Sequence, residues 1–432
     1  MRERPWLWWS LVAALAAVHL VPALAAPREG GGGGAPQMRA MARYAVGVSR
    51  MDQARGIELL QALEGDVASW RDRVRFAAVE GEVAGVEAVL ERIAELREAG
   101  PPGPEARDLD ALEAVYAGRA LGDDERARLR RRHGWFADLA LTRDFDASDP
   151  RRREVIAPAV RTAAAFSVAA IGALGGLVAG VVLLLTWARR RVRGAWTDLL
   201  RPLPRREGDT ALLETVGVFL AALLVAGTLL PLAFVRLLGA SAGPWLYLFS
   251  WLAVPALLWP LGRGFDRARW RADLGLHGGA GLLREAWCGV VGYVAALPLL
   301  AVGFAMSAWL TNALGRDASH PLVQEVARGS VFDVVVLYSM ACVWAPLAEE
   351  AVFRGALYRY LRGVRGRLAS GLFTALLFAA LHPQGLGAVP VLASLALAFA
   401  LLREWRGSLV PCVTAHALHN ALFVTFAITA LR

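Results

Sequence analysis

Two adjacent carboxylates and an arginine interrupt an apolar stretch near the C-terminus, in the sequence AEEAVFRG. A charge at mid-membrane costs about 2.5–3.5 kcal/mol on insertion scales, so charges kept there are candidates for function. Glu350 and Arg354 are four residues apart, share a helix face and can pair. Glu349 is rotated from Glu350 by about 100° in a helix, and a second, uncompensated carboxylate has the environment of a general base. The alternative is a cytoplasmic helix end at which all three side chains are solvated.

A histidine interrupts the next apolar run, in LLFAALHPQG. His382 stands directly before Pro383, and a basic turn near residues 363–366 separates it from Glu349. Both side chains lie about 15 residues from that turn, which is roughly 20–25 Å at the rise of a helix. Two antiparallel helices would therefore bring Glu349 and His382 to one level.

The last apolar run contains VTAHALHNALF, in which His416 and Asn420 are four residues apart and face the same way. Asn420 is one of only two asparagines in the chain, so its place beside a membrane histidine is unusual. His419 points about 60° away from His416 on a helix. We expect His419 to have a packing or helix-contact role.

These residue types suffice for hydrolysis, because a base can activate water while donors hold the developing oxyanion. They could also bind a metal, since two imidazoles and a carboxylate are a familiar zinc set. The sequence has no His-Glu-x-x-His zinc signature, and no Walker or dinucleotide glycine loop precedes a helix.

Three motifs in this region resemble those of the CPBP family, the CAAX prenyl protease and bacteriocin-processing proteins, also called Abi or type II CAAX endopeptidases. The family motifs are Glu-Glu-x-x-x-Arg, Phe-x-x-x-His and His-x-x-x-Asn. One of them alone would be weak, but three in order on separate spans are specific. The resemblance covers about residues 285–432. The matching positions are Glu349, Glu350 and Arg354, then Phe378 and His382, then His416 and Asn420.

The resemblance implies a bundle of membrane helices that encloses a cavity open to peptide and water, with intramembrane endopeptidase activity. By this resemblance, Glu349 and His382 activate the attacking water. His416 and Asn420 stabilise the oxyanion. The remaining motif residues, Glu350 and Arg354, orient the site.

Many family members are described as metalloproteases, whereas the glutamate mechanism requires no cofactor. The lack of a metal-binding spacing favours the metal-free version; a zinc ion, if present, would have Glu349, His382 and His416 as ligands. An alternative function is a catalytically inactive membrane adaptor or bacteriocin-immunity protein of the same fold. A transporter is a third class, because membrane carboxylates and histidines also carry protons, but the two halves show no inverted repeat.

The elements that must position these residues are apolar runs long enough to cross a bilayer. We expect an all-α fold: a polytopic membrane helix bundle of about eight or nine spans with an exported, soluble helical domain near its N-terminus. The arginine-rich loops fall on one side only, which the positive-inside rule assigns to the cytoplasm. The expected spans are residues 5–26, 163–187, 215–235, 244–262, 286–310, one beginning near 331, 368–381, 386–402 and 409–431.

Four segments follow from this pattern. Residues 1–26 are a signal peptide or a signal anchor, because arginines precede an apolar run that ends in small residues. Residues 27–160 form an extracytoplasmic helical domain behind a glycine-rich tether. Residues 161–284 supply additional transmembrane helices, and residues 285–432 form the protease core. In the helical domain, apolar residues recur at spacings of three and four, as at Val86, Val89, Ile93 and Leu96.

Composition agrees with a membrane protein, since 56% of the 432 residues are apolar and 20% are charged. The net charge of +9 comes from arginines in short loops without interleaved aromatic residues, so we expect no nucleic-acid partner. Three cysteines inside apolar runs form no disulfide framework. The expected partners are a peptide or membrane-protein substrate and the lipid bilayer, in the inner membrane of a bacterial cell. The exported domain would bind an unknown protein partner, or else act as a spacer or dimer contact.

Overall fold

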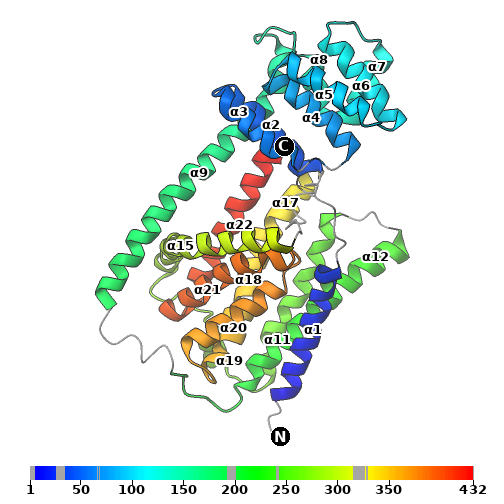
Figure 1. Cartoon of the computed structure of the whole chain (residues 1–432). Helices are drawn as coiled ribbons and strands as arrows, with labels where there is room; N and C mark the ends of the chain where they lie inside the picture. The colour runs from blue at the N-terminus through cyan, green and yellow to red at the C-terminus, as the bar shows by residue number, and fades with distance from the viewer. Residues whose placement is uncertain are drawn as a thin grey trace. The chain divides into compact units, whose positions relative to one another are not determined.

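The structure is a computed structural model that describes residues 5–25, 35–65, 67, 69–191, 201–239, 243–314, 326 and 329–431. Regular secondary structure in these residues is helical throughout, with no strand (Figure 1). The prediction of an all-α fold is therefore confirmed.

Seven segments in the described part of the chain are long and apolar enough to cross a membrane. Two shorter apolar segments, Pro5–Leu15 and Arg367–Ala380, coincide with the two remaining expected runs. The protein is thus a polytopic helical membrane protein. The seven segments are Pro150–Arg189, Thr210–Leu237, Pro244–Gly262, Leu282–Leu314, Val331–Arg362, Leu386–Arg406 and Val410–Ala430.

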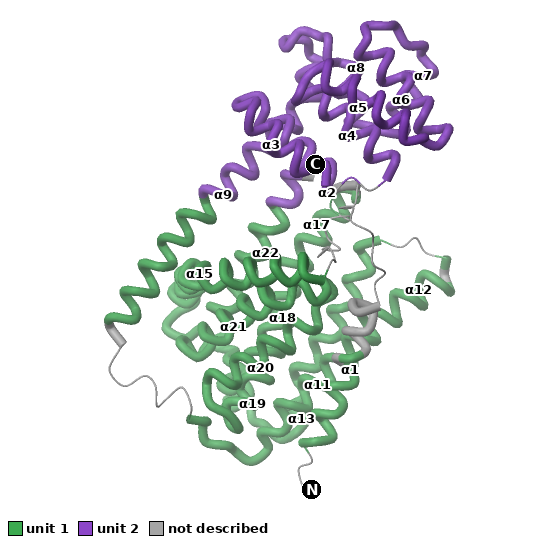
Figure 2. The backbone as a smooth tube through the Cα atoms, viewed as in Figure 1, with its two compact units in different colours: residues 1–27, 172–425 green, residues 28–171, 426–432 purple. Residues whose placement is uncertain are grey.

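The chain forms two compact units (Figure 2). Residues 1–27 and 172–425 make up the membrane unit, and residues 28–171 and 426–432 make up the helical unit. Helix α9 (Pro150–Arg191) belongs to both units and contains Pro158. The domain boundary expected at residue 160 therefore falls inside a continuous helix, because no glycine or loop separates the soluble pattern from the apolar run.

The helical unit packs amphipathic helices around one apolar core. The face expected for α5 is confirmed, since Val89, Ile93 and Leu96 are buried. Asp52 and Ser69 accept hydrogen bonds from backbone N–H groups at the starts of α3 and α4, which satisfies donors that a helix leaves unpaired. Its helices before α9 are α2 (Ala35–Ser49), α3 (Gln53–Glu64), α4 (Trp70–Val83), α5 (Val86–Glu98), α6 (Gly103–Tyr116), α7 (Asp123–His133) and α8 (Trp135–Leu141).

A buried carboxylate joins α6 to α7. Asp108 is fully buried and accepts hydrogen bonds from His133 at 3.0 Å, from Arg132 at 2.5 Å and from Arg128 at 3.3 Å. Burial lowers the pKa of His133 below its usual 6.5, and the nearby Asp108 carboxylate opposes this shift. The neutral imidazole then donates its Nε2 hydrogen to Asp108, so the C-terminal turn of α7 depends on this carboxylate.

We expect Asp108→Ala to loosen the contact between α6 and α7. The substitution leaves the buried imidazole of His133 without its acceptor, which should cost about 1–3 kcal/mol. Hydrogen–deuterium exchange in the full-length protein should become faster in α6 and α7. Asp110→Ala is the matched control, because Asp110 is exposed and, among the described residues, its ion pair is with Arg97. Equal acceleration by both variants would contradict the assignment.

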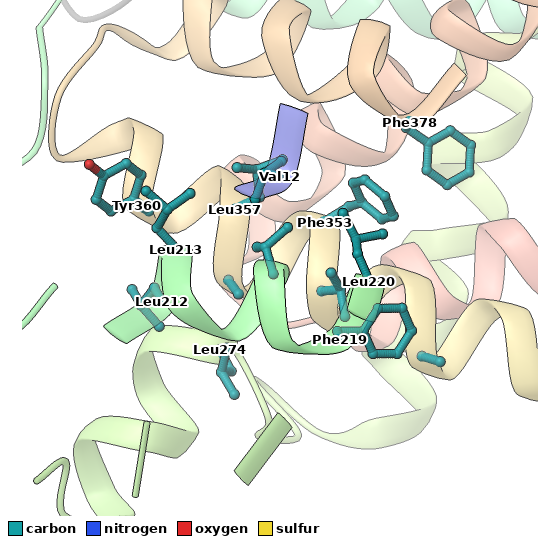
Figure 3. Close-up of a cluster of buried hydrophobic side chains, with 14 of the residues drawn as sticks. Val12, Leu212, Leu213, Phe219, Leu220, Leu274, Phe353, Leu357, Tyr360 and Phe378 are labelled. Carbon is teal, nitrogen blue, oxygen red and sulfur yellow. The ribbon is translucent and has the colours of Figure 1, made fainter. Parts of the chain in front are cut away.

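Helix α1 (Pro5–Ala25) is part of the core of the membrane unit. It packs against α11 (Thr210–Leu224) and α20 (Arg367–Ala380). Val12 is buried beside Leu213 and Leu220 in one apolar cluster (Figure 3). Trp9 meets the ring of Phe373 edge-on, with 5.4 Å between the ring centroids. In this structure the segment expected as a signal peptide or anchor is packed into the bundle.

The elements between α11 and the site-bearing helices include two unusual windings. Residues Val225–Leu229 form a π-helical turn, η1, and Pro244–Leu258 form a long 3₁₀ helix, η2. The others are α12 (Leu230–Leu238), α13 (Trp259–Gly262), α14 (Arg267–Leu274) and α15 (Leu282–Leu314).

The site residues lie on three helical stretches. The turn expected near residues 363–366 is present between α19 and α20, and α21 packs against both α20 and α15. The first stretch comprises α17 (Val331–Ser339), η3 (Met340–Trp344), α18 (Ala345–Glu350), η4 (Ala351–Leu357) and α19 (Tyr358–Arg362). The second is α20, and the third is α22 (Val410–Leu431). Between them in the chain are η5 (Leu386–Ala388) and α21 (Val389–Arg406).

Candidate active site

The helix that carries the two glutamates changes from α-helical to π-helical winding on both sides of them. The π-helical segments η3 and η4 flank α18, the short α-helical piece that contains Glu349 and Glu350. Pro346 has no N–H to donate to the carbonyl of Cys342, and its ring crowds that carbonyl, which disfavours a regular α-turn at this point. Single π-turns inside α-helices are rare and frequently occur at functional sites.

Glu350 and Arg354 form an ion pair inside the bundle. Arg354 Nη1 donates to Glu350 Oε1 at 3.1 Å, and both side chains are 0% exposed. Arg354 Nη2 donates to the carbonyl of Ala396 at 3.0 Å. The guanidinium lies over the rings of Phe378 and Phe399, at 4.6 Å and 5.3 Å from their centroids. The expected pairing is confirmed, and the alternative of a solvated helix end is excluded for these two residues.

Glu350 also fixes the orientation of His416. The Nδ1 atom of His416 lies 2.8 Å from Glu350 Oε1, the same oxygen that accepts from Arg354. An ionised carboxylate can only accept, so Nδ1 carries the hydrogen. The imidazole stacks on Phe399 with 5.1 Å between ring centroids. Nε2 is therefore the ring nitrogen that remains for chemistry.

His382 follows the end of α20 and is held by the helix itself. Its Nδ1 donates to the carbonyl of Phe378 at 2.7 Å, and its ring packs on the Phe378 ring with 4.3 Å between centroids. Because a carbonyl only accepts, Nε2 of a neutral His382 presents a lone pair. Electrostatic interactions link His382 with both Glu349 and His416. The antiparallel helices thus bring the first and second motifs together.

Glu349 has an oxygen without a partner. Its Oε2 atom is buried and makes no hydrogen bond within the described part of the chain. A buried oxygen without a hydrogen bond lowers the stability of the fold by about 1–3 kcal/mol. The Glu349 oxygen is therefore suited to accept a hydrogen bond from a molecule that enters the site. A water molecule or a peptide N–H would satisfy it.

Asn420 ties α22 to the widened turn before the glutamates. Its Nδ2 donates to the carbonyl of Ala341, within η3, at 2.6 Å. The side-chain amide has two hydrogens, so one remains available. His416 and Asn420 lie on one helix at the expected spacing, while His419 contacts another helix through Tyr293, whose hydroxyl is 3.1 Å from His419 Nδ1.

Glu349, His382 and His416 are the residues expected to ligate a zinc ion, if one is present. The described residues include no group of three or more His, Cys, Asp or Glu side chains that could hold a metal ion. One feature of metal sites is present, since His382 and His416 each give their Nδ1 hydrogen to a fixed acceptor. The same arrangement serves a histidine that acts as a base or a donor. In the described structure, Glu349, His382 and His416 are not gathered into such a group.

Sequence reasoning missed three groups that build the site. Phe399 and the Ala396 carbonyl, both on α21, enclose Arg354, and Phe399 also stacks on His416. The Ala341 carbonyl holds Asn420. Nothing distinguishes Phe399 from its apolar neighbours in the sequence, whereas Pro346 could have indicated an irregular turn.

Comparison with known families now adds to this geometry. Residues 331–422 match the family model described as type II CAAX prenyl endopeptidase Rce1-like. The match supports assigning this segment to the CAAX-type intramembrane protease family. The segment lies wholly inside the membrane unit and contains all the motif residues, although it is shorter than the region 285–432 expected from the motifs. No curated protein and no solved structure matches the chain.

We expect substitutions at Glu350 and Arg354, both within the matched segment, to have non-additive effects on the free energy of unfolding. Arg354→Met leaves a buried carboxylate without its counter-charge and should cost roughly 3–5 kcal/mol. Adding Glu350→Gln should recover part of that loss, because the uncompensated charge is gone. Thermal unfolding of the single and double variants in detergent measures the coupling.

The matched control is an exposed ion pair of the helical unit, Arg130 with Asp138. Its coupling should be only about 0.2–1 kcal/mol. Additive losses at Glu350 and Arg354 would contradict the buried pair.

Proposed function

We propose that the protein is an intramembrane endopeptidase whose water is activated by Glu349 and His382. The observation that carries this proposal is the unsatisfied Glu349 oxygen beside the fixed cluster of Glu350, Arg354 and His416, within the matched protease domain. Substrates would be membrane-associated or exported peptides and proteins, because the site lies on helices of a membrane bundle.

In the proposed first step, a water molecule binds between the Glu349 carboxylate and Nε2 of His382. Glu349 takes one proton from the water as its oxygen attacks the carbonyl carbon of the peptide bond. The second hydrogen of the water is held by Nε2 of His382. A base placed in this way contributes typically 10²–10⁴-fold to the rate.

The oxyanion formed by this attack is stabilised by His416 and Asn420. Nδ1 of His416 is already used, so Nε2 can donate only when the ring is protonated, and the carboxylate of Glu350 stabilises that charge. Asn420 supplies the amide hydrogen that Ala341 does not use. The intermediate collapses when the proton on Glu349 passes to the leaving nitrogen and the C–N bond breaks.

This mechanism needs no cofactor, and the arrangement of the three candidate ligands supports the metal-free version. Glu350 and Arg354 act by orienting His416 rather than by touching the substrate. The rival function is a catalytically inactive adaptor or immunity protein of the same fold. Cleavage by the purified protein decides between them.

We expect Glu349→Gln and His382→Ala to abolish peptide cleavage, because each removes a group that holds the attacking water. His416→Ala and Asn420→Ala should lower kcat by about 10²–10³-fold through loss of an oxyanion donor. Mass-spectrometric detection of cut sites in a library of peptides and membrane proteins measures these effects. Activity should persist in the presence of a chelator.

His419→Phe is the matched control, since His419 lies one turn from His416 and contacts only Tyr293 among the hydrogen-bonding groups described. It should retain activity close to that of the wild type. Undiminished cleavage by Glu349→Gln would remove the proposed base. Loss of wild-type cleavage in chelator would favour the zinc mechanism.

We further propose that the protein is a multi-pass protein of a bacterial inner membrane with residues 27–160 outside the cytoplasm. The arginine-rich loops support this, because they join at one end of the membrane unit. Arg362 donates to the carbonyl of Arg201 and to Glu404, and Arg206 and Arg359 both pair with Asp273. A shared basic end is typical of the cytoplasmic side.

We expect a cysteine placed at exposed Met51 to react with a membrane-impermeant maleimide in intact cells, and one at exposed Leu203 to react only after lysis. The helical unit would then face the exterior and the arginine-rich end the cytoplasm. The test uses a variant without the three native cysteines. Labelling of both positions in intact cells would overturn the topology.

The helical unit would recruit or screen exported substrates or a protein partner. It contains a cleft of about 1120 Å³ between α6, α7, α8 and the start of α9. Trp135 and Phe145 line this cleft together with arginines of α7, among them Arg126 and Arg131. Apolar and charged groups side by side support polypeptide binding. If deletion of the unit leaves cleavage and partner binding intact, the unit is a spacer.

A further inference from the structure

A three-residue segment outside the matched protease domain touches several of its helices. Asp273 and Leu274 end α14, and Gly275 follows with φ of +75°, a left-handed conformation that favours glycine. Asp273 and Leu274 are buried, although the segment lies in a connection rich in arginine. We call Asp273–Gly275 the clamp.

The clamp packs closely against the helix that carries the glutamates. Gly355 follows Arg354 within η4, and a Cβ at this position would lie 2.9 Å from the carbonyl oxygen of Leu274. Only glycine permits this approach without displacement. One helical turn further along, Arg359 Nε donates to Asp273 Oδ1 at 3.2 Å. Leu274 also belongs to the apolar cluster that contains Phe353 and Leu357 of the same helix (Figure 3).

The same segment is bonded to the two helices that complete the site. The buried guanidinium of Arg403, on α21, donates Nη2 to the Asp273 carbonyl at 3.0 Å. The N–H of Leu409, which directly precedes α22, donates to the Gly275 carbonyl at 3.0 Å. Helix α21 supplies Phe399, and α22 supplies His416.

We propose that Asp273 is a positioning residue that sets the distance between the glutamate helix and the two helices that hold His416. The proposal rests on the endopeptidase function proposed above. The Asp273 side chain fixes η4 and α19 through Arg359, while the backbone of the clamp fixes α21 and α22. Arg269, on α14 itself, steadies the carboxylate by donating to Oδ2 at 3.3 Å.

Loss of this link is expected to misplace the glutamates relative to His416 without unfolding the bundle. A displacement of about 1 Å in an active site can cost about 10²-fold in rate. Asp273→Asn keeps the shape and the backbone bonds but removes the charge that pairs with Arg359. Its kcat should fall about 10- to 100-fold, while KM and the unfolding temperature stay close to those of the wild type.

The experiment compares purified full-length wild type with Asp273→Asn, Gly355→Ala and the control Asp266→Asn. Asp266 is exposed and caps the start of α14, a role that asparagine also fills. Peptide cleavage gives kcat and KM, and hydrogen–deuterium exchange reports on residues 351–362. Asp273→Asn and Gly355→Ala should lower kcat and accelerate exchange in this segment, and Asp266→Asn should do neither.

A double variant separates the positioning role from general damage. Arg359→Gln added to Asp273→Asn should cause little further loss of kcat, because the two side chains act through one link. Normal exchange in residues 351–362 of Asp273→Asn would overturn the clamp, as would an unchanged kcat in an active enzyme. If the wild type does not cleave, or Glu349→Gln cleaves equally well, the proposed function fails, while the exchange measurement still tests the clamp.

Discussion

The site depends on one ion pair that is buried away from water. Glu350 and Arg354 are both completely buried on one helix of a membrane bundle. Two such charges cost several kcal/mol unless each polar atom finds a partner. The neighbouring helices supply partners for most of those atoms: α21 gives a carbonyl and an aromatic face, α20 gives a second aromatic face, and α22 gives an imidazole. Glu350 Oε2 and Arg354 Nε have no partner among the described residues.

The buried ion pair also separates the roles of the two glutamates. One oxygen of Glu350 accepts from both Arg354 and His416, so its charge is compensated and its side chain is held in place. Glu349, one residue earlier, has no ion pair or hydrogen bond with this cluster in the described structure, and its Oε2 atom is buried without a partner, as is Glu350 Oε2. The ion pair with Arg354 and the contact with His416 are therefore what distinguish the two adjacent carboxylates.

The sequence allowed the local part of this picture to be predicted, and the structure supplied the long-range part. Pairing of Glu350 with Arg354 follows from a spacing of four, and the spans follow from apolar runs. Phe399 could not be singled out, because its role depends on contact with Arg354 across 45 residues. Asp273 could not be singled out either, because nothing local in its arginine-rich loop indicates that it meets Arg359. The continuity of α9 was missed because an amphipathic pattern and an apolar run can share one helix.

The two π-helical segments around α18 bear on how this protein can vary during evolution. A π-turn holds one residue more than the α-turn it replaces. Removing a single residue between 340 and 344 would restore regular winding, and the helix that follows would keep its phase because only the extra residue is lost. Glu350 would still face Arg354 and His416. The Ala341 carbonyl, which accepts from Asn420, lies inside the turn that would close, so a deletion here would disturb Asn420 before it disturbed the glutamates.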